Sequence, residues 1–156
     1  MGIIHRQESS ENKLIVVATD NEYKLAKKRF KHRIIIKTGV GGINVVRTLK
    51  RLPKWLKITN FGYAGSNKIP PGTEVNIGRC KLYHPNVNYK EKTYELNGEV
   101  ICYTSNDFVT ETNIEEPCVF DMELAYICAL GFKRVESIKI ISDNLSLKQY
   151  EEEIKW

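Results

Sequence analysis

The chain has 156 residues, of which 42 % are hydrophobic and 28 % charged, and its net charge is +5. This length suits one globular domain, and no apolar run approaches the ~20 residues that a membrane-spanning helix needs. Residues 1–12 are polar and lack the pattern of a signal peptide. We therefore expect a flexible segment at 1–12, a single domain over 13–156, no membrane contact and a cytoplasmic location.

The four cysteines are widely spaced and form no C-x-x-C pair. Without a secretory context, such cysteines are typical of buried thiols rather than of a disulfide framework. The three histidines are isolated from one another and from the cysteines, so the sequence does not predict a zinc site. We expect neither a metal nor a cofactor.

Two basic clusters, at residues 24–33 and 47–57, account for much of the positive charge. One interpretation is a face that binds phosphate or nucleic acid. Apolar residues recur within both clusters at helical spacing, however, which favours the solvated sides of two amphipathic helices. No recognisable nucleic-acid-binding motif accompanies the charge, and we expect no nucleic-acid partner.

The first sixty residues alternate between strand and helix patterns. The run KLIVVA at 13–18 is continuously apolar, as in a strand covered on both faces of a parallel sheet. Asp20 or Asn21 can cap the following helix. The expected elements, in order, are a strand at 13–18, a helix ending near Phe30, a strand at 33–37, a glycine turn at 38–42, a helix to about Leu52 and a strand at 57–61.

The rest of the chain predicts shorter strands and fewer helices. The pair Asn97-Gly98 is a favoured two-residue hairpin turn. Asp121 is a suitable helix cap, and Gly131 is a suitable stop. The expected elements are a second glycine turn at 62–65, a hard turn at 70–72, a strand at 74–78, a hairpin over 94–103, a helix from Asp121 to about Leu130, a strand at 135–141 and a short helix over about 147–155.

This order predicts an α/β fold, with three layers (α/β/α) around a central mixed, mostly parallel twisted sheet. Ligands of such folds bind at the carboxyl ends of the strands. Three acidic residues fall just past expected strands, Glu22, Asp107 and Asp143, and a fourth, Glu123, lies in the first turn of the helix that Asp121 opens. Taken singly, three of them suit a helix start. A cluster of acids at one edge of a sheet is costly without a use, which favours a functional site.

Six short motifs, in order along residues 14–144, resemble those of the 5′-methylthioadenosine/S-adenosylhomocysteine nucleosidases, within the purine nucleoside phosphorylase superfamily. Each motif alone is weak, and their common order makes the resemblance specific. The chain looks like a shortened member, chiefly between Leu82 and Tyr103. The motifs are ATDNE at 18–22, TGVGGIN at 38–44, NFGYAG at 60–65, SNDFV at 105–109, DME at 121–123 with Ala125, and IISD at 140–143.

The resemblance implies a role for each matching residue. Asp143 is expected to be the general acid that protonates the leaving purine, Ser142 to orient it, and Glu22 to activate the attacking water. Phe108 is expected to stack on the purine, and Glu123 and Met122 to hold the ribose. Further substrate contacts are expected from Val109, Ala64, Gly65 and Lys139. Lys139 stands where an arginine is usual, and Asn106 where a glycine is usual.

The implied reaction is cleavage of a purine nucleoside N-glycosidic bond, with a 5′-substituted adenosine as substrate and a homodimer as the assembly. Phosphate needs charge-assisted donors, yet no arginine lies between Arg51 and Arg79, and Glu22 would repel an anion. Hydrolysis is therefore favoured over phosphorolysis. A phosphate-dependent phosphorylase, a nucleoside-binding or regulatory protein with weak turnover, and an enzyme for a phosphorylated nucleoside stay open.

Overall fold

The computed structural model of the chain describes residues 12–84 and 92–153, apart from the side chain of Leu147. The flexible segment expected at 1–12 falls almost wholly outside these ranges. Twelve elements occur within them, and they are listed here in chain order. They are β1 (Lys13–Val17), α1 (Asp20–Arg29), β2 (Ile34–Lys37), α2 (Gly42–Leu49), β3 (Lys57–Ser66), β4 (Glu74–Leu82), β5 (Tyr94–Glu95), β6 (Val100–Thr104), β7 (Cys118–Asp121), α3 (Leu124–Ala129), β8 (Arg134–Asp143) and α4 (Leu147–Glu153).

One mixed sheet contains all eight of these strands. β2, β1, β3 and β8 run parallel to one another, in that spatial order. Beyond them the sheet closes: β8 pairs with β4, β4 with β6, β6 with β7, and β7 returns to β3. The α/β class and the mixed, mostly parallel sheet are confirmed. The closure into a five-stranded ring is a feature that the expected three-layer arrangement did not include.

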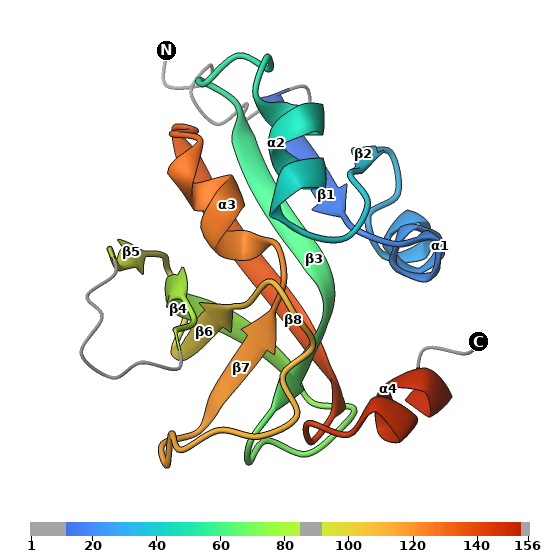
Figure 1. Cartoon of the computed structure of the whole chain (residues 1–156). Helices are drawn as coiled ribbons and strands as arrows, with labels where there is room; N and C mark the ends of the chain where they lie inside the picture. The colour runs from blue at the N-terminus through green and yellow to red at the C-terminus, as the bar shows by residue number, and fades with distance from the viewer. Residues whose placement is uncertain (1–11, 85–91, 154–156) are drawn as a thin grey trace.

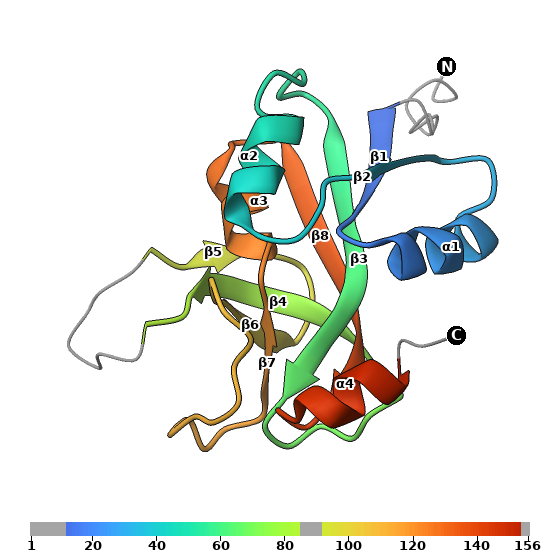
Figure 2. The same cartoon turned by 45° about the vertical axis from the view of Figure 1, so that its right-hand side comes forward.

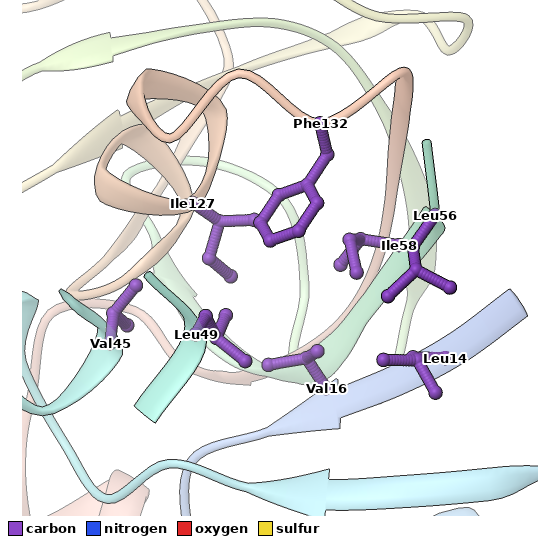
Figure 3. Close-up of a cluster of buried hydrophobic side chains, with 8 residues drawn as sticks. All are labelled: Leu14, Val16, Val45, Leu49, Leu56, Ile58, Ile127 and Phe132. Atoms are coloured by element: carbon purple, nitrogen blue, oxygen red, sulfur yellow. The ribbon is translucent and has the colours of Figure 1, made fainter. Parts of the chain in front are cut away.

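Helices lie on both faces of β1 and β3. α2 and α3 lie side by side on one face (Figures 1 and 2), where their apolar side chains meet those of the strands in one cluster (Figure 3). α1 covers the opposite face, with Ala26 packed against Ile15, Val17 and Phe61. Successive side chains of a strand point to opposite faces. Leu14 and Val16 of β1 therefore face α2 and α3, and Ile15 and Val17 face α1.

Two of the expected elements were wrong, and one strand was not expected. Residues 62–65 are not a turn but the second half of β3, which continues to Ser66. Residues 94–103 are not a hairpin: β5 pairs antiparallel with β4, and β6 pairs parallel with β4. Contacts with β4, which is distant in sequence, outweigh the local turn preference of Asn97-Gly98. β7 was not expected, since its four residues are too short to show a period.

Helix boundaries also differ from the expectation. Thr19, rather than Asp20 or Asn21, is the N-cap of α1, and α2 ends at Leu49, before Pro53. α3 begins at Leu124, although Asp121 still accepts a hydrogen bond from the Leu124 N–H at 2.8 Å.

The side chains of both basic clusters are mainly exposed, which both interpretations of these clusters predict. Cys80, Cys102 and Cys118 are buried free thiols, as expected, whereas the free thiol of Cys128 is partly exposed. None of the helices in the described ranges has the length and apolar character to cross a membrane.

Candidate active site

A cleft of about 160 Å³ lies at the carboxyl ends of the parallel strands β1, β3 and β8. α4 packs beside the ends of β3 and β8 and forms part of its wall (Figure 2). Eight of the ten residues expected to form the site line this cleft: Glu22, Ala64, Gly65, Phe108, Met122, Glu123, Ser142 and Asp143.

Glu22 enters the cleft from the first turn of α1. Its backbone N–H donates to Thr19 Oγ1, and its own Oε1 accepts from the Thr19 N–H, which completes a capping box. Oε1 also accepts from the Ala18 N–H at 2.8 Å, and Oε2 from the Tyr63 N–H at 2.9 Å. Burial raises the pKa of Glu22, although the charge of Lys139 and these N–H groups act in the opposite direction.

Two glycines of β3 make room for the carboxylates of the cleft. A Cβ atom on Gly62 would lie 2.5 Å from Oε2 of Glu22, and one on Gly65 would lie 2.8 Å from Oδ2 of Asp143. Both distances are too short for real contacts, so a side chain at either position would displace the acid. The two glycines are three residues apart, roughly 10 Å along a strand, so the carboxylates occupy different points of the cleft.

Asp143 is placed by an irregularity in β8. Ala64 pairs with Ile141 and Gly65 with Asp143, so Ser142 is an extra residue that re-aims the strand. Ser142 Oγ donates to Asp143 Oδ1 at 2.6 Å, and the Leu145 N–H donates to Oδ2 at 2.9 Å. Burial raises the pKa of Asp143, against the lowering effect of these two donors.

Glu123 lies at the N-cap of α3. Its Oε2 accepts from the Gly41 N–H at 2.8 Å, which joins the glycine turn before α2 to the cleft. Burial and the nearby charge of Asp121 raise the pKa of Glu123 to about 7. Its carboxyl group is therefore poised between the protonated and ionised forms near neutral pH.

Lys139 was expected to contact the substrate, but its side chain does not line the cleft. It is 1 % exposed, and its Nζ lies 3.1 Å from Oδ2 of Asp121 in a buried ion pair. Thr104 Oγ1 donates to the other oxygen of Asp121 at 2.5 Å. Burial raises the pKa of Asp121, but the charge of Lys139 and the hydrogen bonds from Thr104, Leu124 and Lys139 together outweigh burial, and the pKa lies below its usual value.

Two aromatic side chains of the cleft come from the segment between β6 and β7 and from α4. Phe108 meets Tyr150 edge to face, with ring centroids 5.5 Å apart. Asp107 and Val109 do not reach this cleft; they line a separate hollow with Tyr83. Of the four acids singled out by position, three are therefore brought together and Asp107 is not.

Seven residues that line the cleft are not among those expected from the sequence, and they include Tyr63, Asp121 and Tyr150. Asp121 follows an apolar run at 118–120, as Glu22 and Asp143 follow other runs, and that pattern is a usable signal. Tyr63 and Tyr150 have no such signal, because their positions depend on the bulged pairing of β8 and on the packing of α4.

The cleft combines three carboxyl groups of raised pKa with one of lowered pKa and a buried cation behind them. This arrangement is suited to acid–base chemistry. Every buried side-chain nitrogen or oxygen in the described ranges has a hydrogen-bond partner. Within residues 12–84 and 92–153, no three histidine, cysteine, aspartate or glutamate side chains are grouped as metal ligands would be.

Several solved structures share this fold. Futalosine hydrolase of Helicobacter pylori is 13 % identical with a TM-score of 0.74, over 92 % of this chain and 90 % of that one. S-adenosylhomocysteine nucleosidase of Streptococcus pyogenes, solved with 5-methylthiotubericidin, is 16 % identical with a TM-score of 0.74, over 92 % and 89 %. A Chlamydia trachomatis 5′-methylthioadenosine nucleosidase variant, bound to 5′-methylthioadenosine, is 18 % identical with a TM-score of 0.73, over 92 % and 87 %.

No protein-family model and no curated protein sequence matches the chain. At these identities the structural likeness shows a common fold, and a fold can serve different activities.

Proposed function

We propose that this chain is a hydrolase that cleaves the N-glycosidic bond of a purine nucleoside, with a 5′-substituted adenosine as substrate. The observation that carries the proposal is the single cleft in which Glu22, Glu123 and Asp143 lie together with Phe108. The shared fold supports it, because one protein of similar fold was solved with 5′-methylthioadenosine and another with 5-methylthiotubericidin.

The chemistry requires an acid on one side of the bond. The bond breaks through an oxocarbenium-like sugar, and the purine leaves with the bonding electron pair, so a proton must neutralise the purine as it departs. Asp143 is assigned as the general acid, since burial raises its pKa toward the working range. Ser142, which donates to Asp143 Oδ1 at 2.6 Å, orients the carboxyl group.

On the other side of the bond, Glu22 is assigned to activate water for attack on the sugar carbon. Glu123 and Met122 hold the ribose, Phe108 stacks on the purine, and the backbone at Ala64 and Gly65 borders the substrate. Lys139 acts from behind the cleft, where its charge favours the ionised form of Glu22 and holds Asp121 in place.

The hydrogen bonds of Glu22 favour water over phosphate. Backbone N–H groups that converge on one point make an anion-binding site. Here the N–H groups of Ala18, Thr19 and Tyr63 converge on the chain's own carboxylate. That carboxylate occupies the donors and repels a second anion, so phosphorolysis is the less favoured reaction.

We expect the protein to be cytoplasmic and to form a homodimer. The apolar side chains of Val40, Ile43 and Val46, at and before α2, are 45 %, 75 % and 37 % exposed. A second subunit covering them would remove this surface from water. Size-exclusion chromatography with light scattering measures the assembly, and a monomer at micromolar concentration would contradict this expectation.

The test of the reaction is incubation with 5′-methylthioadenosine, adenosine and inosine, with and without phosphate, followed by chromatography of the free base. We expect adenine release from 5′-methylthioadenosine that does not depend on phosphate. Release only with phosphate would identify a phosphorylase instead. Binding of the nucleosides without release of base would identify a nucleoside-binding protein.

A further inference from the structure

The segment that carries Phe108 has no regular secondary structure of its own. Residues 105–117 connect β6 to β7 without a helix or a strand. In such a connection the chain is held by individual side-chain contacts rather than by a hydrogen-bonded ladder. The place of Phe108 in the cleft therefore depends on where this segment is fastened to the rest of the protein.

Asn106, two residues before Phe108, fastens the segment to α3. The hydroxyl of Tyr126 donates a hydrogen bond to Asn106 Oδ1 at 2.5 Å. Asn106 is the position at which this sequence departs from the glycine of the motif that it resembles. A glycine would offer no side-chain acceptor, so this hydrogen bond is a feature of the present chain.

Tyr126 is itself held firmly, which makes it a fixed anchor. A Cβ atom on Gly42 would lie 2.6 Å from the Tyr126 ring, so the ring packs directly on the backbone at the start of α2. The Tyr126 N–H donates to the Glu123 carbonyl oxygen at 3.1 Å, and Glu123 accepts from Gly41. Tyr126 is thus linked through Glu123 to the cleft.

We propose that Asn106 and Tyr126 act as a pair of positioning residues that hold Phe108 in place to stack on the base of a bound nucleoside. The proposal rests on the proposed function. Holding the segment before the substrate arrives reduces the ordering that binding would otherwise require. The pair touches none of the reacting groups, so its effect falls on substrate binding rather than on the chemical step.

The experiment removes each half of the hydrogen bond separately. Tyr126→Phe keeps the ring against Gly42 and loses the hydroxyl, and Asn106→Leu keeps the size of the side chain and loses the acceptor. Asn106→Asp retains an acceptor oxygen and is the conservative rescue. Tyr94→Phe, in β5, which lies far from α4 (Figure 1) and contributes no residue to the cleft, is the matched control for loss of one phenol hydroxyl.

We expect Tyr126→Phe and Asn106→Leu each to raise the KM for 5′-methylthioadenosine by about fivefold, the equivalent of one net hydrogen bond, while kcat stays within about twofold. The double variant should be no worse than either single variant, because both remove the same interaction. Asn106→Asp and Tyr94→Phe should keep the wild-type KM. Unchanged KM in both single variants, or additive effects in the double variant, would overturn the proposal.

Hydrogen exchange of peptides covering 105–112 gives a second readout that does not require turnover. Exchange should be faster in Tyr126→Phe and Asn106→Leu than in the wild type, and unchanged in Asn106→Asp. If the wild type releases no base from any nucleoside, the proposed function fails, while this measurement still decides whether the pair holds the segment. Equal exchange in all variants would refute the positioning role.

Discussion

The two halves of β3 meet very different surroundings. In the first half, Ile58 is 1 % exposed and packs among the aliphatic side chains of α2 and the ring of Phe132 (Figure 3). In the second half, Gly62 and Gly65 have no side chains, and the carboxylates of Glu22 and Asp143 take the space instead. One strand thus contributes apolar burial at one end and a scaffold for charged groups at the other.

The comparison teaches how a protein keeps buried acids in a stable sheet. Burial of an ionised carboxylate is costly unless hydrogen bonds compensate it. Glu22 receives backbone N–H groups, and Asp143 receives a serine hydroxyl and a backbone N–H. The pKa values of both acids are raised, so the hydrogen bonds do not fully offset the effect of burial. In the proposed function, this remaining shift suits the two acids to proton transfer.

The largest effect on activity is expected from Asp143, the acid beside the second half of β3. Asp143→Asn should lower kcat for nucleoside hydrolysis by about 10²- to 10⁴-fold, since general acid catalysis contributes that much. The melting temperature should change little, because the amide fits the same space. Asp107→Asn, in the neighbouring hollow, is the matched control and should keep wild-type kcat. Turnover that survives in Asp143→Asn would remove the general-acid assignment.

Substitutions in the first half of β3 should change the stability of the protein rather than its activity. Ile58→Ala should lower the free energy of unfolding by about 3 kcal/mol through lost burial and a cavity, with kcat unchanged while the protein is folded. Ile34→Ala, at a side chain that is 54 % exposed, should change it by no more than about 0.5 kcal/mol. Urea denaturation measures both free energies of unfolding. Equal losses of stability in the two variants would contradict the assignment of Ile58 to the core and of Ile34 to the surface.

The acids of the cleft should make stability depend on pH. The pKa of Glu123 is raised from 4.5 to about 7, so between these values the folded state binds more protons than the unfolded state. Stability contributed by this group is therefore present at low pH and lost as pH rises through that window, by up to about 3 kcal/mol.

Melting curves between pH 5 and pH 8 test this direction. Glu123→Gln should flatten the decline, whereas Glu95→Gln, an exposed control on β5, should follow the wild type. A Glu123→Gln profile identical to that of the wild type would mean that the carboxyl group does not carry the effect.

The smallest effect is expected from the glycines of β3. Gly62→Ala should lower kcat by about tenfold, because the new methyl group displaces the Glu22 carboxylate and misaligned groups react slowly. Gly65→Ala is its counterpart beside Asp143. Gly62→Ala should change the acidic limb of the pH–rate profile, because Glu22 is assigned as the base. Gly65→Ala should change the alkaline limb, because Asp143 is assigned as the acid. Wild-type profiles in both variants would show that the close approach has no kinetic consequence.

Sequence reasoning anticipated the parallel strands and most of the cleft-lining residues, for a common physical reason. Buried parallel strands need continuous apolar runs, and their carboxyl ends meet at one edge. Glu22 and Asp143 come four and two residues after the last apolar residue of such runs, so their positions could be inferred before the fold was known. Phe108 and Glu123 lie in segments without this simple relation, and the resemblance of their motifs located them.

The local pattern failed where distant contacts decide the backbone. Residues 62–65 contain two glycines, which favour a turn in isolation, yet pairing with β8 keeps them in an extended strand. Asn97-Gly98 favours a hairpin, yet β5 and β6 both pair with β4. In each case hydrogen bonds to a remote strand outweigh a preference worth about 1 kcal/mol.

The α/β class and the positions of Glu22 and Asp143 follow from the sequence alone, because hydrophobic periodicity and strand ends are local properties of the chain. Only the tertiary structure decided that the sheet closes through β4, that Ser142 bulges to turn Asp143 toward Gly65, and that Lys139 pairs with Asp121 behind the cleft. These features arise from contacts between segments far apart in the chain, and the free energy of such contacts is not contained in any local pattern.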